Sequence, residues 1–305
     1  MEHSNIDAAL LAEYGEDETR SFQKRSQLSE IWRRLRKNHV AILGLIIILA
    51  FVLAAVGADF IADYQTQVVE QNVRQRQLPP SVEHWFGTDT YGRDVFARIV
   101  HGGRISLSVG FIAVTFSSLL GGMLGATCGL YGGMVDNFIM RIMDAVVSIP
   151  GILLTLAMVA ALGHGTQNLM IAITISQIPA FTRVVRASIL SVVGQEFIES
   201  ARSYGTGSFR VIYKHIIPNA IGPLIVQATM SIAGTILQIS GLSFLGMGVQ
   251  PPDPEWGAML AEARPVMRTM PHLVIFPGMA IVLAALSLNL LGDGLRDALD
   301  PKLRD

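Results

Sequence analysis

Charged side chains and cysteine are both scarce in this sequence of 305 residues. Asp, Glu, Lys and Arg occupy 15% of the positions and apolar residues 51%, which is far from the balance of a soluble domain. Cys128 is the only cysteine, so an internal disulfide and a cysteine metal cluster are excluded, and the thiol is expected to pack as a small buried apolar group. A net charge of -1 gives no overall field that would attract nucleic acid. This composition predicts a protein of the lipid bilayer.

Motifs for nucleotide hydrolysis and for hydrolytic catalysis are missing as well. None of the four lysines follows a glycine, so the chain has no Gly-x-x-x-x-Gly-Lys loop that could hold the phosphates of ATP. The seven histidines form no His-Glu-x-x-His pair, and no spacing suggests a Ser-His-Asp arrangement. We therefore expect no catalytic residue, no metal site and no cofactor in this chain.

Six apolar stretches are candidates for membrane-spanning helices. The hydrocarbon core of a bilayer is about 30 Å thick and a helix rises about 1.5 Å per residue, so a span needs roughly 20 apolar residues. Some of the stretches are longer than one span and too short for two, which predicts that they include a surface or re-entrant part. The expected spans are 40–58, 105–135, 145–162, 168–183, 219–252 and 272–292.

The positions of the basic residues predict how these spans are oriented. Six spans place both termini on the same side, and Lys and Arg accumulate in cytoplasmic segments. If the termini lie inside, cytoplasmic segments hold 16 of the 23 basic residues and external segments hold seven. The opposite orientation would invert this ratio. Both termini are therefore expected in the cytoplasm.

A polar segment between the fourth and fifth expected spans has the pattern of a helix, a glycine turn and a second helix. Phe197, Ala201 and Tyr204 share one face of the first helix, which makes it short and amphipathic. Gly205 then fits a left-handed helix cap, and Pro218 stands where the chain enters the membrane again. On the predicted topology this segment faces the cytoplasm.

This segment resembles the coupling segment of bacterial ABC importer permeases. The pattern of that family is Glu-Ala-Ala, three residues, Gly, nine residues and then Ile-x-Leu-Pro. Ser200 replaces an alanine, His215 stands where Ile is usual, and Ile217 replaces Leu, changes that remove little volume or helicity. The resemblance implies that a partner ATPase is contacted through Glu199, Ala201, Arg202, Tyr204, Gly205 and Pro218.

Three further segments extend the resemblance to a subfamily. Residues 84–94 (HWFGTDTYGRD), 241–260 (GLSFLGMGVQPPDPEWGAML) and 290–303 (LLGDGLRDALDPKL) look like the second permease of dipeptide, oligopeptide and nickel transporters. Residues 84–94 are also rich in turn formers, and they have too few alternating carboxylates for a calcium loop. The resemblance implies an all-α integral membrane protein of the bacterial inner membrane, with about six transmembrane helices, a cytoplasmic coupling helix and the type I ABC importer permease fold.

Partners and cargo follow from the same resemblance. In this family two ATP-binding subunits, a sister permease and an extracytoplasmic solute-binding protein complete the transporter, with the lipid bilayer around it. The implied cargo is short peptides or peptide-like solutes. Glutathione, a nickel chelate and an opine stay open as alternatives, because the binding protein largely selects the solute.

The expected organisation of the chain has four parts. Residues 1–30 are expected to form a flexible cytoplasmic tail, 31–63 the first transmembrane helix and its flanks, and 64–104 an external segment. Residues 105–305 then form the core permease domain, which contains the coupling segment 195–218.

Polar side chains on two of the expected spans are candidates for the translocation pathway. Gln227, Ser231 and Gln238 share one face of the fifth span, and Thr174 and Gln177 share one face of the fourth. These faces either line a wet passage or form hydrogen bonds between helices, and the sequence leaves both interpretations open.

Two other classes of function compete with an importer permease. A membrane enzyme, such as an intramembrane protease, would need ionisable residues at membrane depth, and the uncharged stretches supply almost none. A passive channel would share the glycine-rich helices with prolines at positions 150, 179 and 277. Only the coupling segment argues against the channel.

Overall fold

The computed structural model describes residues 27–193 and 217–299. Within these ranges the chain forms helices and loops, and the one contact of strand type is an isolated bridge between Thr88 and Asp94. In chain order the helices are α2 (Gln27–Lys37), α3 (His39–Val56), α4 (Ala58–Ile61), η1 (Tyr64–Val69), η2 (Val73–Gln75), α5 (Val95–Tyr131), α6 (Gly133–Val147), α7 (Gly151–Leu162), α8 (Thr166–Val193), α11 (Ile217–Phe244), α12 (Trp256–Ala263), η4 (Arg264–Val266) and α13 (His272–Leu299).

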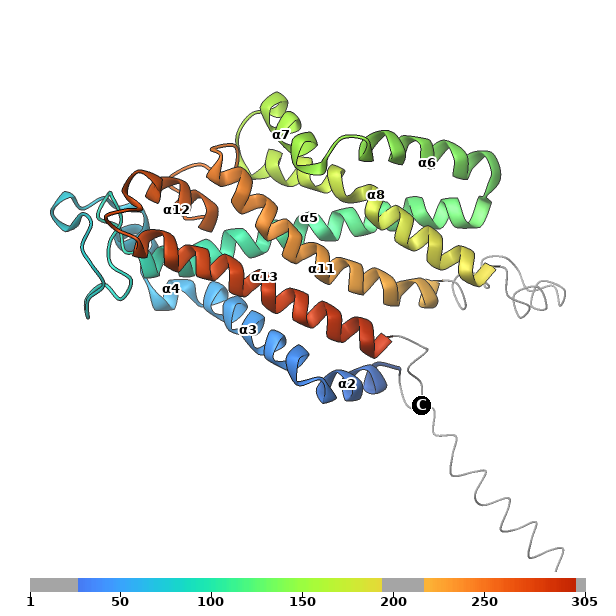
Figure 1. Ribbon diagram of the computed structural model, residues 1–305, viewed down its shortest axis with the longest axis horizontal. Coiled ribbons are helices and arrows are strands. Elements are labelled where there is room, and N and C mark those ends of the chain that lie inside the picture. Colours follow the sequence, from blue (N-terminus) through green and yellow to red (C-terminus); the bar gives the residue numbers. More distant parts are fainter. Residues whose placement is uncertain (1–26, 194–216, 300–305) are drawn as a thin grey trace, which may run out of the picture.

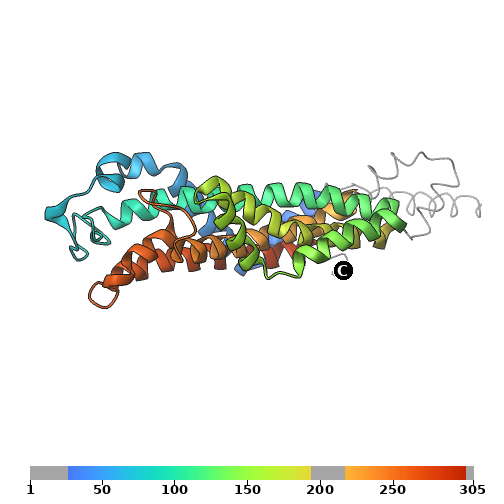
Figure 2. The same cartoon turned by 90° about the horizontal axis from the view of Figure 1, so that it is seen from above.

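The long helices run along one axis of an elongated bundle (Figures 1 and 2). The loops gather at one end, on the left of Figure 1, which we call the cap and define as residues 57–104 and 245–276. We call the other half the base and define it as residues 27–41, 128–144, 182–193, 217–230 and 291–299. The described chain stops at Val193 and resumes at Ile217 in the base, close to where α13 ends (Figure 1).

The first span begins at a side-chain cap. The carboxamide oxygen of Asn38 accepts hydrogen bonds from the backbone nitrogens of Val40 and Ala41, both at 3.1 Å, so α2 and α3 are separate helices joined at one residue. α3 then packs closely along α13, because a Cβ atom at Gly44 would lie 2.6 Å from the backbone oxygen of Ser287. The expected span 40–58 is confirmed with small shifts at its ends.

α5 is longer than the second expected span. It has 37 residues, or about 55 Å of helix, and it begins at Val95 rather than near residue 105. Asp94 caps this start, since its carboxylate accepts a hydrogen bond from the Ala97 nitrogen at 2.8 Å. The extension carries Arg98 and His101, which are charged or polar but buried against other parts of the cap, so the helix continues beyond the apolar stretch.

The third expected span, 145–162, is wrong as a continuous helix. The chain instead forms α6 and α7, which meet at an angle of 84°. Ser148, Ile149 and Pro150 make the break, because proline has no backbone N–H to donate and disfavours a helical residue before it. α7 has 12 residues, about 18 Å, and is too short to cross the bilayer alone. The bent pair counts as one broken span or as a re-entrant element.

Glycines bring α5 and α8 together. A Cβ atom on Gly121 would lie 2.6 Å from Cβ of Phe181, and one on Gly125 would lie 2.5 Å from the backbone oxygen of Thr182. Glycine at these positions therefore lets the two helices approach closely. Cys128 is buried on the same helix, as expected for a small apolar group.

Among residues 27–193 and 217–299, five helices are long and apolar enough to cross a membrane, and the number of spans rises to six if the bent pair is one span. They are α3, α5, α8, α11 and α13. The expectation of about six spans and the all-α fold are therefore confirmed for the described residues. The fifth uncharged run ends as a helix at Phe244, and its remainder forms a loop of the cap.

Candidate functional site

Most of the predicted ATPase-contacting residues lie outside the described residues. Glu199, Ala201, Arg202, Tyr204 and Gly205 belong to the segment 194–216, of which the structure gives no description. Pro218 lies in the first turn of α11, where a proline without an N–H is tolerated. The segment connects the base ends of α8 and α11, so any force applied to it acts directly on these two helices.

Two ion pairs connect α8 to α6. Arg186 donates two hydrogen bonds to the carboxylate of Asp136, from Nε and Nη2, each at 2.6 Å. Arg183 reaches Asp144 at 2.7 Å. The sequence predicted neither acidic partner. Asp136 and Asp144 are eight residues apart on α6, which is about two helical turns. This spacing is the one sequence signal that could have suggested that both carboxylates face the same neighbouring helix.

The predicted pathway residues form hydrogen bonds in the middle of the bundle. Nε2 of Gln177 donates to Oγ1 of Thr235 at 2.7 Å and so joins α8 to α11. Nε2 of Gln238 donates to Oγ1 of Thr155 at 2.9 Å and joins α11 to α7. The structure therefore brings the two predicted faces next to each other.

The other three pathway residues form hydrogen bonds with residues one turn away on the same helix. Nε2 of Gln227 donates to Oγ of Ser231 at 3.1 Å, within one helix. Oγ1 of Thr174 donates to the Met170 oxygen at 2.7 Å, one turn back along α8. Gln227 also lines a cavity of about 430 Å³ between α8, α11 and α13, together with Val184, Met230 and Arg296. The cavity opens at the base, and Gln227, a residue of the predicted pathway, borders it.

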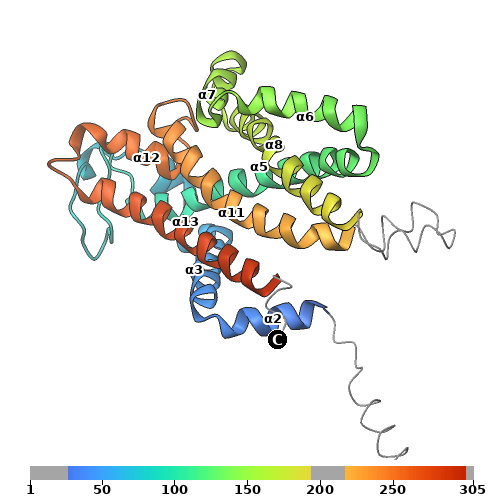
Figure 3. The same cartoon turned by 45° about the vertical axis from the view of Figure 1, so that its right-hand side comes forward.

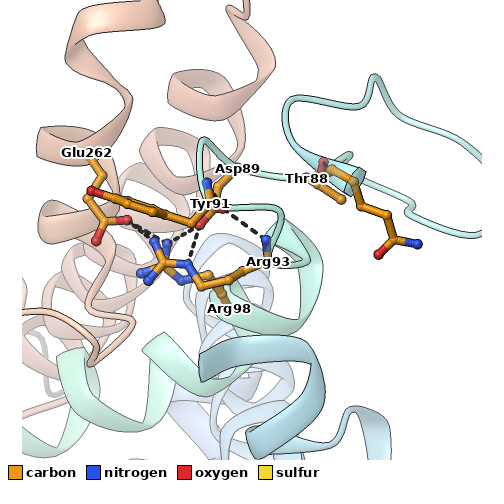
Figure 4. Close-up of polar contacts among 7 residues, drawn as sticks. Thr88, Asp89, Tyr91, Arg93, Arg98 and Glu262 are labelled. Carbon is orange, nitrogen blue, oxygen red and sulfur yellow. Dashed lines mark hydrogen bonds and ion pairs between the residues drawn. The ribbon is translucent and has the colours of Figure 1, made fainter. Parts of the chain in front are cut away.

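A buried ionic cluster, which the sequence did not predict, lies in the cap. Oδ2 of Asp89 accepts hydrogen bonds from Nε of Arg93 at 2.7 Å and from Nη1 of Arg98 at 2.6 Å. Oε2 of Glu262 accepts from Nη2 of Arg93 and from Nη1 of Arg98, both at 2.6 Å (Figure 4). Two positive and two negative side chains thus alternate. The cluster joins the loop before α5, the first turn of α5 and the end of α12.

The geometry around this cluster explains how it is held. The guanidinium of Arg93 also lies 4.6 Å from the ring centre of Tyr91, a cation–π contact. The Arg98 side chain is only 1% exposed, and its Nε and Nη2 have no hydrogen-bond partner among the described residues. Gly87 and Gly92 both have positive φ, at 76° and 83°, so the predicted turn in residues 84–94 is confirmed and aims Asp89 inward.

A second buried carboxylate fixes α12 between two spans. Oε2 of Glu255 accepts a hydrogen bond from the Ala258 nitrogen at 2.9 Å, which caps α12, and Oε1 accepts from the hydroxyls of Ser106 and Ser240, both at 3.3 Å. The next residue, Trp256, donates from its ring nitrogen to the Ile99 oxygen at 2.9 Å. α12 is therefore anchored on α5 and on α11.

An exposed ion pair closes the end of α3. Arg104 donates from Nε to the Ala55 oxygen at 3.0 Å and from Nη2 to Asp59 at 3.1 Å. The hydrogen bond from Arg104 is the main reason why the pKa of the Asp59 carboxyl lies below its ordinary value. No group of three or more His, Cys, Asp or Glu side chains among the described residues is placed to hold a metal ion.

Comparison with known proteins places these features in context. Residues 121–305 match the family described as binding-protein-dependent transport system inner membrane component, and residues 26–80 match the N-terminal transmembrane domain of oligopeptide transport permease C. The dipeptide transport system permease protein DppC of Alkalihalophilus pseudofirmus is 47% identical over 275 residues, which are 90% of each chain. The glutathione transport system permease protein GsiD of Escherichia coli O157:H7 is 45% identical over 282 residues, 92% of this chain and 93% of the relative.

A solved structure is similar in fold. It is described as inward facing conformations of the MetNI methionine ABC transporter, and the matched chain has a TM-score of 0.52 at 20% identity. The match covers 66% of this chain and 96% of the other. At this level of identity the likeness concerns the arrangement of helices alone.

Proposed function

Since this chain belongs to the family of binding-protein-dependent transport system inner membrane components and is the permease subunit of an ABC importer, we propose that it forms half of a pathway for short peptides or peptide-like solutes. The chain is a multi-pass protein of the inner membrane. It is a transport component rather than an enzyme, because in this family ATP is hydrolysed on a separate subunit.

The observation that supports a peptide solute is the pair of relatives. One is named for dipeptides and the other for glutathione, and each covers at least nine tenths of this chain at 45% identity or more. Both solutes are small, flexible and polar, with amide and carboxylate groups. Glutathione is therefore kept as a second candidate, whereas nickel chelates and opines rest on the resemblance of sequence motifs alone.

We propose the partners that the family pattern implies: a sister permease, two ATP-binding subunits and an extracytoplasmic solute-binding protein. The ATP-binding subunits would contact Glu199, Ala201, Arg202, Tyr204, Gly205 and Pro218 in the segment 195–218. A movement of this segment would carry α8, and the Arg186–Asp136 pair would transmit it to α6. The hydrogen bond between Gln238 and Thr155, which joins α11 to α7, would then extend the movement to these two helices. Rigid helices would convert this movement into alternating access.

The proposed orientation places the base in the cytoplasm and the cap outside. It rests on the 16 of 23 basic residues that fall in segments on the side of the termini. The proposed domains follow: a tail at 1–30, the first span at 31–63, an external segment at 64–104 and the permease core at 105–305. Residues 95–104 of that external segment are the first turns of α5, so the last boundary falls inside a helix.

The pathway residues remain a proposal. We favour Gln227 as the wet position because it borders the cavity at the base, and we assign Gln177 and Gln238 to contacts that rearrange between states. Thr174 and Ser231 complete the polar faces. A cysteine at position 227 should react with an aqueous thiol reagent during turnover. Protection in every nucleotide state would remove position 227 from the pathway.

ATP-coupled uptake is the experiment that tests the function. The chain would be produced with its partner subunits, reconstituted in vesicles, and assayed with a labelled dipeptide and with labelled glutathione. We expect uptake that requires both ATP and the binding protein. The Gly205→Val variant should stay in the membrane but transport poorly, because valine opposes a left-handed cap by about 1–2 kcal/mol.

Gly205→Asn is the matched control, since asparagine adopts the left-handed conformation more readily and should retain most of the uptake. Solute flux that persists without ATP, or that is equal in the valine variant and the wild type, would favour a passive channel. Uptake of neither solute under otherwise active conditions would contradict the peptide assignment and leave the importer intact.

A further inference from the structure

The short helix α2 lies at the base, directly before the first span. Asn38 alone separates it from α3, and Figure 3 shows α2 running across the end of α3 instead of continuing its axis. The helix has the sequence QLSEIWRRLRK, in which apolar and basic residues fall on different faces. A helix in this position lies where the hydrocarbon of the bilayer gives way to lipid headgroups.

One face of α2 is already covered by the protein itself. Leu35 is buried, and it packs together with Ile31 against Ala41 of α3 and Ala298 of α13. The approach is close, because a Cβ atom on Gly294 would lie 3.2 Å from a methyl group of Leu35. These contacts fix the rotation of α2 about its own axis.

The remaining surface of α2 combines an aromatic ring with positive charge. Trp32 is 53% exposed although it is the largest apolar side chain of the helix. Arg36 is one turn further along, next to Trp32, while Arg33 and Lys37 form a second row beside them, and all three are exposed. Within residues 27–193 and 217–299, none of the three makes an ion pair with another side chain.

This combination matches the chemistry of an anionic lipid surface. Tryptophan prefers the headgroup level of a bilayer, where its ring is in an apolar environment and its N–H is near water. Long basic side chains bury their methylene groups and place their charges at the phosphates. Clusters of Lys and Arg immediately before a span attract anionic lipids, each residue strengthening the attraction by about fivefold.

We propose that α2 is a binding site for anionic phospholipid, with Trp32 inserted at headgroup level and Arg33, Arg36 and Lys37 on the lipid phosphates. The site goes beyond the proposed transport function and does not depend on it. It gives the base an attachment to the membrane surface at the point where α3 and α13 meet.

Quenching of tryptophan fluorescence by brominated lipids tests this site. The complete transporter would be placed in vesicles of unbrominated phosphatidylcholine to which a brominated lipid is added. The added lipid is either phosphatidylglycerol or phosphatidylcholine, in each case brominated near the headgroup end of the acyl chains. The chain has three tryptophans, so the signal of Trp32 is taken as the difference from a Trp32→Phe variant. We expect Trp32 to be half-quenched at a mole fraction of phosphatidylglycerol at least about fivefold lower than that of phosphatidylcholine.

Single substitutions then identify the ligands of the lipid. Arg36→Gln should reduce the preference for phosphatidylglycerol by about fivefold, and Arg36→Lys should retain it, because the charge is kept. Arg268→Gln, which removes an exposed arginine of the cap, is the control and should change nothing. One substitution alters the balance of basic residues by a single charge, so the orientation of the spans is preserved.

Three results would overturn the proposal. Equal quenching by the two lipids would mean that Trp32 touches the bilayer without selecting its charge. Absence of quenching by either lipid would mean that a protein partner covers this face of α2. A preference that survives Arg33→Gln, Arg36→Gln and Lys37→Gln would place the lipid elsewhere. The measurement requires no transport, so its failure would leave the importer function untouched, and a failure of uptake would leave this site untouched.

Discussion

At the cap, Asp89, Arg93 and Arg98 are buried and the Glu262 side chain is 13% exposed, whereas in the base the Arg183–Asp144 pair that connects α8 to α6 lies largely in solvent. In the Arg183–Asp144 pair the two side chains are 45% and 59% exposed. Removing one partner of a buried ionic contact costs about 3–5 kcal/mol, but an exposed pair contributes only about 0–1 kcal/mol. The cap is therefore fixed by interactions that are costly to break, and the base is held by contacts that can exchange. This asymmetry is compatible with the proposal that an ATPase acts on the base.

The largest expected effect comes from removing one charge of the cap cluster. Glu262→Gln keeps the shape of the side chain but leaves Arg93 and Arg98 with Asp89 as their one acidic partner among the described residues. We expect the protein to lose about 3–5 kcal/mol of unfolding free energy. Thermal unfolding of the purified transporter in detergent measures the loss.

Asp144→Asn in the base is the matched control, because it removes a charge from an exposed pair with the same change of chemistry. Its expected cost is about 0–1 kcal/mol. Equal losses in Glu262→Gln and Asp144→Asn would show that burial does not distinguish the two ends.

A smaller effect is expected where α5 packs against α8, between the cap and the base. Gly121→Ala places a methyl group 2.6 Å from Cβ of Phe181 and should cost about 1–3 kcal/mol through overpacking. Gly122→Ala is the control on the next residue, where the nearest atom lies 4.0 Å away, and it should be neutral or slightly stabilising. Unfolding of both variants by heat would be compared. A normal Gly121→Ala protein would mean that the two helices are not in close contact.

Arg186→Gln should affect transport more than stability. The Arg186 side chain is partly exposed, so the loss of its pair with Asp136 should lower the unfolding free energy by at most about 1 kcal/mol. The same change removes a contact that would carry the movement of α8 to α6. We expect ATP-driven uptake to fall while ATP hydrolysis continues. Uptake and hydrolysis that remain coupled as in the wild type would exclude this role.

The smallest effect concerns an exposed pair within the cap itself. The hydrogen bond from Arg104 keeps the pKa of Asp59 below its ordinary value of 3.8, so the folded state favours the charged carboxylate. A lowered pKa contributes stability above 3.8 and loses it as the pH falls through the folded value. The difference in unfolding free energy between the wild type and Asp59→Asn should therefore be small at neutral pH and vanish in acid. A difference that grows in acid would have the wrong sign.

The sequence predicted the spans better than the contacts between them. Uncharged stretches predicted α3 and α13 closely, because the hydropathy of a segment depends only on its own residues and not on its partners in the fold. The break at Pro150 was missed because apolar residues continue on both sides of it, and the same composition suits a straight span and a bent pair. The start of α5 was also missed, because its first turns carry Arg98 and His101, which interrupt the uncharged stretch although both are buried.

The cap cluster could not have been predicted from the sequence. Arg98 and Glu262 are 164 residues apart in the chain, and neither lies in a pattern that indicates its partner. Charged residues next to a span are normally expected to be exposed to water. Only the fold brings the four residues of the cap cluster together. The proposed coupling residues are the opposite case: their spacing in the sequence supports the prediction, but Glu199 and Gly205 lie outside the described residues, so their role stays a prediction.

Protease accessibility of tags at two loops tests the central claim, an importer permease with its ATPase-contacting segment in the cytoplasm. The tags would be inserted after positions 203 and 253, which flank α11, and a third would follow Asp305. In intact cells stripped of any outer membrane, the tag at 253 should be cleaved, while those at 203 and at the carboxyl end should be protected. Cleavage at position 203 from outside would contradict the account, because no cytoplasmic ATPase could then reach Glu199 or Gly205.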